Sequence, residues 1–387
     1  MIPEETDDDI LLMYKILDGS IGANFGDLKD PRREGKQHHK LIHILFITIL
    51  ATLAGANNLK EVALYATRKQ KWLESFLHLT HGVPCYVTFW WIFVLLKPSD
   101  LEKCFLKWVQ SMVALSGDEV VAIDGKALRG TAQKDKANSF VHMVSAWASQ
   151  SGFTLGQLKV DTKSNEITAI PKLLDVIDIE GATVTIDAMG CQTDIASKII
   201  EKGANYVLAL KGNQGNLHDE LENFFEQAEG VNFLGVSHDV AISEEDGHGR
   251  TEKREVYVTS DIDWLPQKDE WANLQTIIMI KSHRLIPGKP GSIERRFYIS
   301  SLPPSAAKLG AIVRKHWGIE NKVHWLLDVA FREDSLKAKV GNIAENTSII
   351  RRIALNLLKR DTTIKAGIEA KRKVAAWDDS YLVRLLL

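Results

Sequence analysis

Two aspartates follow short apolar runs that are typical of buried strands. Val120–Ile123 precedes Asp124, and residues 182–186 precede Asp187. Ligands of open α/β sheets bind at the carboxyl ends of such strands. Two neighbouring carboxylates repel each other, and a divalent cation with oxygen ligands relieves that repulsion. Either aspartate alone could cap a turn, as Asp124 before Gly125 would, but the matched pair favours a metal site.

A third carboxylate would complete a site for two metal ions. His316, Glu320, His324 and Asp328 are spaced four residues apart, so a helix presents them on one face. Two ions held by three carboxylates suit phosphodiester chemistry, because one activates the nucleophile and the other stabilises the leaving oxygen. The spacing alone also describes a solvated helix surface. It does not select Glu320 over other nearby acidic residues, which are Asp328, Glu333 and Asp334.

The elements around these residues follow a recognisable order. Apolar runs, alternation and turn signals predict three strands, then a helix, a strand, a helix, a strand and a helix. The expected strands cover residues 120–123, 140–148, 154–160, 182–186 and 206–210, and the expected helices cover 166–177, 191–202 and 216–228. This βββαβαβα order is the topology of the ribonuclease H fold, an α/β fold. Its first and fourth strands are neighbours, which would bring Asp124 and Asp187 side by side.

The remaining segments divide the chain into four parts. Apolar spacing of three and four residues predicts a helical N-terminal domain over residues 1–115. Residues 116–228 form the first part of the ribonuclease H-like catalytic domain. Alternating patterns return in residues 229–305, which we interpret as a mostly β insertion. Residues 306–387 are expected to be helices that complete the catalytic domain.

Composition indicates an ordinary folded protein without a strong bulk charge. The chain has 387 residues, 45% of them hydrophobic, and its 48 Lys and Arg balance 50 Asp and Glu. Residues 311–387 carry 15 Lys and Arg against 9 Asp and Glu, so the last fifth is its basic part. These cations suit either phosphate contacts or the solvated face of an amphipathic helix. They include Arg351, Arg352, Lys359, Arg360, Lys371, Arg372 and Lys373.

Cysteine usage and hydropathy predict a cytoplasmic protein. The three cysteines are far apart and form no CxxC pair, which argues against a disulfide framework or a thiolate zinc site. The longest apolar run, residues 41–56, is too short to cross a bilayer comfortably, and the acidic N-terminus lacks a signal peptide's basic start. We therefore expect no membrane partner.

Six sequence blocks together resemble a known family. The first block is Ala122-Ile123-Asp124-Gly125-Lys126 with Arg129-Gly130. The others are Lys163-Ser164-Asn165-Glu166-Ile167, Asp187-Ala188 with Gln192, Lys211-Gly212-Asn213-Gln214, His248-Gly249-Arg250, and His316-Trp317 with Ile319-Glu320-Asn321 and His324-Trp325. In this order they are similar to the blocks of bacterial insertion-sequence DDE transposases, in the subgroup that includes the H-repeat-associated proteins. The resemblance runs from about Asp30 to Lys359.

The resemblance implies a ribonuclease H-like catalytic domain with an inserted β domain, a helical N-terminal domain and an Asp-Asp-Glu triad. Matched residue by residue, the triad is Asp124, Asp187 and Glu320, which would bind Mg²⁺ or Mn²⁺ as two ions. Only the resemblance prefers Glu320 to its acidic neighbours. It also implies double-stranded DNA as the substrate, both element ends and target, and an oligomer that holds two ends together.

Further residues of the matched blocks are candidates for DNA contacts. They are Lys126, Arg129, Lys211, Asn213, Gln214, His248, Arg250, Arg314 and Lys322. The chain also departs from the Tyr, Arg, Glu, Lys signature of the broader group, because Val313, His316 and Leu327 stand at the Tyr, Arg and Lys positions. Residues 84–91 differ too from the expected polar block ending in arginine. These departures leave two alternatives open: a metal-dependent nuclease of the same fold, and a non-catalytic DNA-binding protein derived from a transposase.

Overall fold

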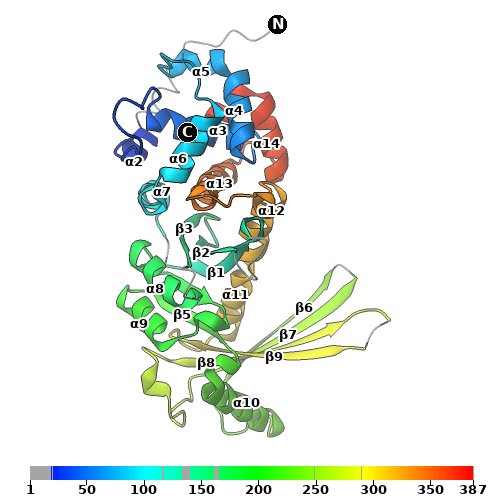
Figure 1. Ribbon diagram of the computed structural model, residues 1–387. Helices are drawn as coiled ribbons and strands as arrows, with labels where there is room; N and C mark the ends of the chain where they lie inside the picture. Colours follow the sequence, from blue (N-terminus) through cyan, green and yellow to red (C-terminus); the bar gives the residue numbers. More distant parts are fainter. Residues whose placement is uncertain are drawn as a thin grey trace.

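The computed structural model describes residues 19, 21–115, 117–132, 140–160, 165–247, 249–288 and 290–386. A single mixed sheet, a helical body above it and a projecting β arm make up this part of the chain (Figure 1). Within these residues, no helix combines the length and the apolar character that crossing a membrane requires.

The sheet has nine strands within the described residues, in the order β3-β2-β1-β4-β5-β9-β8-β7-β6. β1, β4 and β5 run parallel to one another, and the other neighbours are antiparallel. The strands are β1 (Val120–Leu128), β2 (Val141–Ala148), β3 (Thr154–Lys159), β4 (Thr183–Ile186), β5 (Asn205–Leu210), β6 (Asp239–Gly247), β7 (Arg250–Thr259), β8 (Thr276–Leu285) and β9 (Ser292–Ser300). The predicted βββαβαβα order is confirmed, and the fold is ribonuclease H-like.

Strand β1 is longer than the sequence predicted. The expectation that it stops at Asp124 is wrong, because β2 continues to pair with β1 through Leu128. The parallel ladder between β1 and β4 does end there, at the pair Ile123 and Ile186. From Asp124 onward, one edge of β1 is therefore paired with β2 while the edge toward β4 is open.

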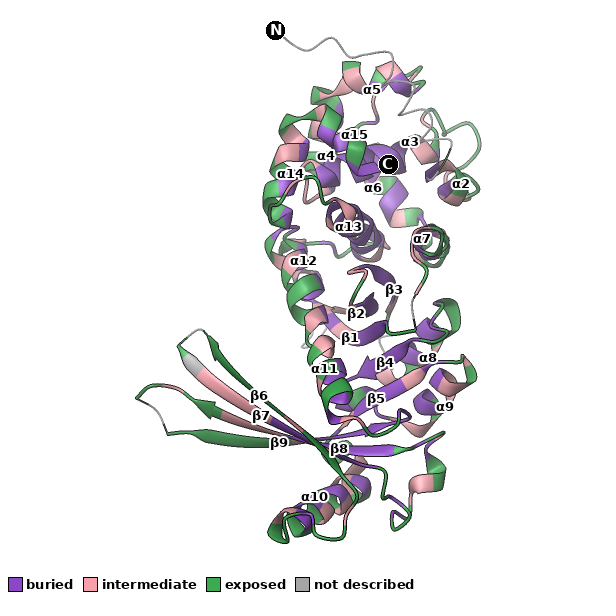
Figure 2. Ribbon diagram, turned by 180° about the vertical axis from the view of Figure 1, so that it is seen from behind, coloured by how far each residue is buried: buried purple, intermediate pink, exposed green. Residues whose placement is uncertain are grey.

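Helices cover both faces of the parallel part of the sheet. α8 (Glu166–Val176) and α9 (Thr193–Glu201) lie on one face, and α11 (Ala306–His316) lies on the other (Figures 1 and 2). Leu309 and Ile312 of α11 form a small core with Val207 and Ile278 of the sheet. Burial of apolar side chains on both faces explains why these strands are almost continuously hydrophobic.

The segment expected as a β insertion extends the sheet. β9 pairs with β5, with Leu208 opposite Ile299, and β8, β7 and β6 follow in turn. The outer halves of these strands leave the body as an exposed arm (Figure 2). α10 (Gly215–Gly230) and the short turn η5 (Lys268–Glu270) accompany its base.

The C-terminal segment divides between two places, unlike the expectation that all of it completes the catalytic domain. α11 packs on the sheet, with α12 (Trp325–Val329) beyond it, whereas α13 (Ile343–Arg360), α14 (Ile368–Trp377) and α15 (Asp379–Leu386) join the N-terminal helices. Those helices are α2 (Gly22–Phe25), α3 (Leu41–Leu53), α4 (Leu59–Arg68), α5 (Gln70–Phe76), α6 (Tyr86–Leu95) and α7 (Pro98–Met112). α13 is buried along almost its whole length, in the centre of this helical body (Figure 2).

Four of the C-terminal cations are internal, so the expectation that they contact DNA phosphates is wrong for this structure. Arg351 and Arg352 lie beside the fully buried Glu333. Lys371 donates to the Leu358 carbonyl at 3.0 Å, and Arg372 donates twice to the Thr52 carbonyl near the end of α3. These cations are buried because carboxylates and backbone carbonyls satisfy them.

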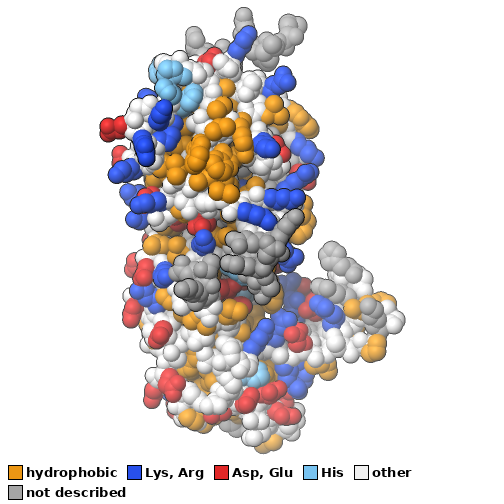
Figure 3. Space-filling model, in the orientation of Figure 1, with side chains coloured by type: hydrophobic (Ala, Val, Ile, Leu, Met, Phe, Trp, Pro, Cys, Tyr) orange, Lys and Arg blue, Asp and Glu red, His pale blue; other side chains and the backbone are white. Residues whose placement is uncertain are grey.

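Apolar side chains are exposed on one side of α6. Tyr86, Val87, Trp91 and Leu95 are exposed, and Figure 3 shows hydrophobic side chains gathered over this helix. This is the segment that departs from the expected polar block.

Candidate active site

Asp124 and Asp187 lie at corresponding positions of neighbouring strands. Each directly follows the last register pair of the β1 and β4 ladder, so the two carboxylates flank the open edge of β1. Asp124 accepts a hydrogen bond from the Gly125 N–H at 2.9 Å. Asp187 accepts from the Met189 N–H at 3.1 Å and from the Gly190 N–H. Asp187 therefore also caps the short turn η3 (Ala188–Gly190).

Glu320 reaches the same edge of the sheet from the helical segment that follows α11. The helix expected to present His316, Glu320, His324 and Asp328 on one face is interrupted. α11 ends at His316, and η6 (Glu320–His324) has π-helical geometry. Nδ1 of His324 lies 3.1 Å from Oε2 of Glu320 and 3.5 Å from Oδ2 of Asp124. Ligand atoms of these three residues lie within 4.8 Å of one another. A π turn at a cluster of this kind is typical of functional sites.

Three members of the four-residue polar stripe, which are His316, His324 and Asp328, contact the sheet, whereas Glu320 is exposed. Nδ1 of His316 lies 3.0 Å from Oγ1 of Thr185 on β4. His324 is only 3% exposed, and Asp328 accepts from Lys126 of β1. The stripe therefore connects the helix to the two strands that carry the aspartates.

Negative charge accumulates at this point of the sheet. Burial, together with the nearby carboxylates of Asp187, Glu166 and Glu320, raises the pKa of Asp124 to about 7. Burial and the nearby cations of Arg352 and Lys126 lower the pKa of His324 to about 4, so its imidazole is neutral at pH 7. Carboxylate oxygens are the ligands that Mg²⁺ and Mn²⁺ prefer, and the neutral His324 ring can hold the Glu320 carboxylate by a hydrogen bond. The residues fit a divalent cation.

Lys126 is not free in this structure. Its side chain is 8% exposed, and Nζ donates to Oδ2 of Asp328 at 2.5 Å, with Asp334 at 3.9 Å. Arg129, three residues further, is 81% exposed and only distantly paired with Asp334. Lys126 therefore joins β1 to α12, whereas Arg129 is accessible to a ligand.

The turn after β5 supports the loop that carries Asp187. Within η4 (Gly212–Gln214), Nδ2 of Asn213 donates to the Ala188 carbonyl at 2.6 Å, and Nε2 of Gln214 donates to the Cys191 carbonyl at 2.8 Å. Lys211 is exposed beside them. The two amides thus position the second aspartate, and Lys211 faces solvent.

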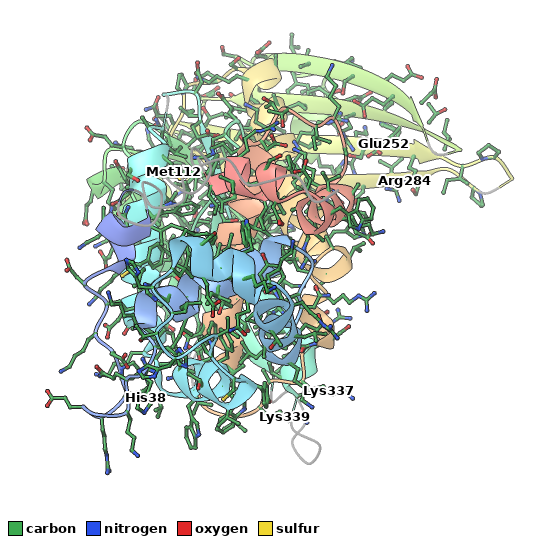
Figure 4. All side chains as sticks on the ribbon, turned by 90° about the horizontal axis from the view of Figure 1, so that it is seen from above. His38, Met112, Glu252, Arg284, Lys337 and Lys339 are labelled. Carbon is green, nitrogen blue, oxygen red and sulfur yellow. The ribbon has the colours of Figure 1, made fainter. Side chains whose placement is uncertain are left out.

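A groove of about 1090 Å³ lies between the arm and the helix that precedes Glu320. Strands of the arm contribute Arg254, Arg284 and Arg296 to its lining. Figure 4 shows Arg284 beside Glu252, its register partner on β7. Basic side chains gather where the arm leaves the body (Figure 3).

The helix side of this groove carries two more predicted DNA contacts. Arg314 is paired with Glu245 of β6, and Nζ of Lys322 lies 5.7 Å from the ring centroid of Trp147. Arg250 begins β7 at the outer end of the arm, and His248 lies outside the described residues.

Glu166 is the site residue that the sequence reasoning missed. It begins α8, its negative charge reaches Asp124, and burial raises its own pKa. A signal was present, because Glu166 belongs to one of the six matched blocks and follows the third strand. It was not selected because a carboxylate in the first turn of a helix is common without any ligand.

The fold and the carboxylates at its sheet edge define a class of nucleic-acid enzymes with ribonuclease H-like architecture. Comparison with known families narrows this class. The family described as "Transposase DDE domain" matches residues 115–357, and the family described as "DDE_Tnp_1-associated" matches residues 23–109. The chain belongs to the DDE transposase family, in which use of a divalent metal ion is general.

Curated relatives agree over nearly the whole chain. "Putative transposase YncI" of Escherichia coli O157:H7 is 38% identical over 363 residues, which are 93% of this chain and 92% of the relative. "H repeat-associated putative transposase YhhI" of Escherichia coli strain K12 is 37% identical over 364 residues, 93% of this chain and 95% of the relative. The resemblance inferred from the six blocks is confirmed.

A solved structure described as a piggyBac transposase synaptic complex with hairpin DNA is similar to this protein. The alignment covers 97% of this chain and 80% of the chain in that structure. Its TM-score is 0.47 and its identity is 10%. This likeness is too distant to carry an argument.

Proposed function

We propose that this chain is an active DNA transposase that cleaves the ends of an insertion sequence and transfers the strands to target DNA. The observation that carries the proposal is the meeting of Asp124 and Glu320 at His324, beside Asp187 on the neighbouring strand. These three carboxylates would hold Mg²⁺ or Mn²⁺, as two ions. Bound ions of this kind activate a nucleophilic oxygen and stabilise the leaving oxygen of a phosphodiester.

The proposed reaction consists of two phosphoryl transfers at one site. Hydrolysis of a phosphodiester at the element end releases a 3′-hydroxyl, and that hydroxyl then attacks a phosphodiester of the target with loss of another 3′-oxygen. His324 contributes by orientation. A carboxylate can only accept, so the neutral ring donates its Nδ1–H to Glu320 and holds that carboxylate toward Asp124.

DNA is proposed to lie along the groove between the arm and η6. Arg129, Lys211 and Lys322 present exposed cations around the site, and Arg254, Arg284 and Arg296 line the groove. Arg250, Arg314 and His248 are kept as proposed contacts. Because two element ends must be joined, we propose an oligomer on double-stranded DNA. The three free cysteines suit the reducing cytoplasm as its compartment.

The test is cleavage of supercoiled DNA that carries the gene's own flanking sequences, with Mg²⁺ or Mn²⁺. Wild-type protein is compared with Asp124→Asn and with Asp175→Asn, a control in which an exposed carboxylate of α8 is changed. Discrete cuts that Asp124→Asn abolishes and Asp175→Asn retains are the expected result. Joined products distinguish a transposase from a nuclease. Folded wild-type protein that binds this DNA without cutting it would support the non-catalytic alternative.

A further inference from the structure

A fourth carboxylate, that of Glu166, approaches the site from the other face of the sheet. Glu166 begins α8, which packs on β2 and β3, whereas Glu320 follows α11 on the opposite face. Side chains alternate along a strand, so Asp124 and Gly125 face opposite sides of β1. Asp124 faces His324, and Gly125 faces Glu166. The two glutamates thus reach the same point of β1 from its two faces.

The glycine at position 125 makes room for this carboxylate. A Cβ on Gly125 would lie 1.9 Å from Oε1 and 2.7 Å from Oε2 of Glu166. Such contacts are far too short, so any other residue at position 125 would displace the Glu166 carboxylate. The backbone itself does not require glycine here, because Gly125 is not among the residues of positive φ.

No cation compensates Glu166 among the residues that the structure describes. Its half-buried carboxylate lies near those of Asp124 and Asp187. A carboxylate held in this way between other carboxylates is costly unless a positive charge binds with it. The N-terminus of α8 supplies only a partial positive charge.

We propose that Glu166 is a fourth protein ligand of the divalent cation site, beside Asp124 and Asp187, and that Gly125 is the residue that admits it. The inference rests on the proposed function in one respect, which is that a divalent cation binds between the two aspartates. It adds that the cation is held from both faces of β1, whereas the Asp-Asp-Glu triad places a glutamate on one face only.

The experiment measures Mn²⁺ binding to the full chain without DNA, by isothermal titration calorimetry and by electron paramagnetic resonance of free Mn²⁺. Glu166→Gln keeps the size of the side chain and removes its charge. It is expected to weaken Mn²⁺ binding at least tenfold or to remove one of the bound ions. Asp175→Asn, at the other end of the same helix, is expected to bind Mn²⁺ as the wild type does.

Asp124→Asn separates the two proposals. If the wild type binds Mn²⁺, Asp124→Asn abolishes binding and Glu166→Gln binds normally, the role of Glu166 is overturned and the proposed function stands. Glu166 would then be only a first-turn residue of α8. If the wild type binds no Mn²⁺, the proposed function itself fails, and the role of Glu166 fails with it.

Gly125→Ala provides an independent arm that does not remove a carboxylate. The added Cβ is expected to weaken Mn²⁺ binding about as much as Glu166→Gln does, because it displaces the Glu166 side chain. In a Glu166→Ala background the same Gly125→Ala change should have no further effect on Mn²⁺ affinity, which a double-mutant cycle measures. Additive losses of affinity would overturn the proposal. Far-UV circular dichroism of each variant verifies that it is folded.

Discussion

Replacement of Asp124 should stabilise the metal-free protein, and only above a defined pH. Burial and three nearby carboxylates raise its pKa from 3.8 to about 7. The folded protein therefore binds a proton that the unfolded chain releases near pH 4. The stability linked to that proton is fully present below pH 4 and is lost as the pH rises through 7. Asp124→Asn has no proton to lose, so its advantage over the wild type grows between pH 4 and pH 7.

The size of this effect follows from the shift. About three pKa units at about 1.4 kcal/mol each correspond to about 4 kcal/mol. Water reaches the carboxylate, whose side chain is 26% exposed, and screening reduces the expected gain to about 2 to 3 kcal/mol at pH 8. For a chain of this length, that gain raises Tm by about 3 °C.

Thermal unfolding followed by circular dichroism in EDTA at pH 8 and pH 5 measures the difference. Asp124→Asn should exceed the wild type by about 3 °C at pH 8 and by less than half of that at pH 5. Asp175→Asn should show no such pH dependence. Saturating Mn²⁺ should reverse the order at pH 8, because the ion stabilises only a protein that binds it. Equal Tm differences at the two pH values, or a less stable Asp124→Asn in EDTA at pH 8, would refute the electrostatic reasoning.

Two further predictions concern charged residues outside the triad. Glu333→Gln should lower the free energy of unfolding by about 3 to 5 kcal/mol, as measured by urea denaturation, because it leaves the buried guanidinium of Arg352 without its counter-charge. A loss below 1 kcal/mol would show that the hydroxyls of Ser348 and Ser145 are sufficient partners for Arg352. Lys322→Ala should reduce the slope of log K for DNA binding against log salt concentration by about 0.9. Lys126→Met should leave that slope unchanged, because the ammonium of Lys126 is paired with Asp328. A reduced slope for Lys126→Met would mean that the ion pair opens to meet a phosphate.

The sequence predicted the order of the elements and the adjacency of the two aspartates because both depend on local patterns. Buried apolar runs identify β1 and β4, and the ribonuclease H topology then makes them neighbours. The end of β1 could not be predicted in the same way. Asp124-Gly125 is a turn signal, yet pairing with β2 carries the strand through to Leu128. Tertiary pairing overrides a local preference here, and Gly125 serves a close approach by Glu166.

The prediction that the C-terminal cations contact DNA was wrong for a related reason. The spacing of Lys and Arg along α13 and α14 is typical of the solvated side of amphipathic helices. A sequence does not show that other helices surround such a helix. α13 is buried along almost its whole length. Glu333, which neutralises Arg352, lies before α13 in the chain and is separated from it by a loop. Such pairs become visible only in three dimensions.

The four buried cations of the C-terminal helices are not available to neutralise DNA phosphates. Exposed cations remain around the site and in the groove. Two arginines of the groove are paired with carboxylates on the surface, Arg296 with Glu294 and Arg314 with Glu245. Surface pairs of this kind contribute at most about 1 kcal/mol. If DNA occupies the groove as proposed, each arginine can therefore exchange its carboxylate for a phosphate at small cost. Arg351 and Arg352 have no such freedom, because Glu333 is buried with them. Lys126 is itself only 8% exposed, so its ammonium has little access to DNA. The chain thus separates cations that hold the site together from cations that are available to DNA.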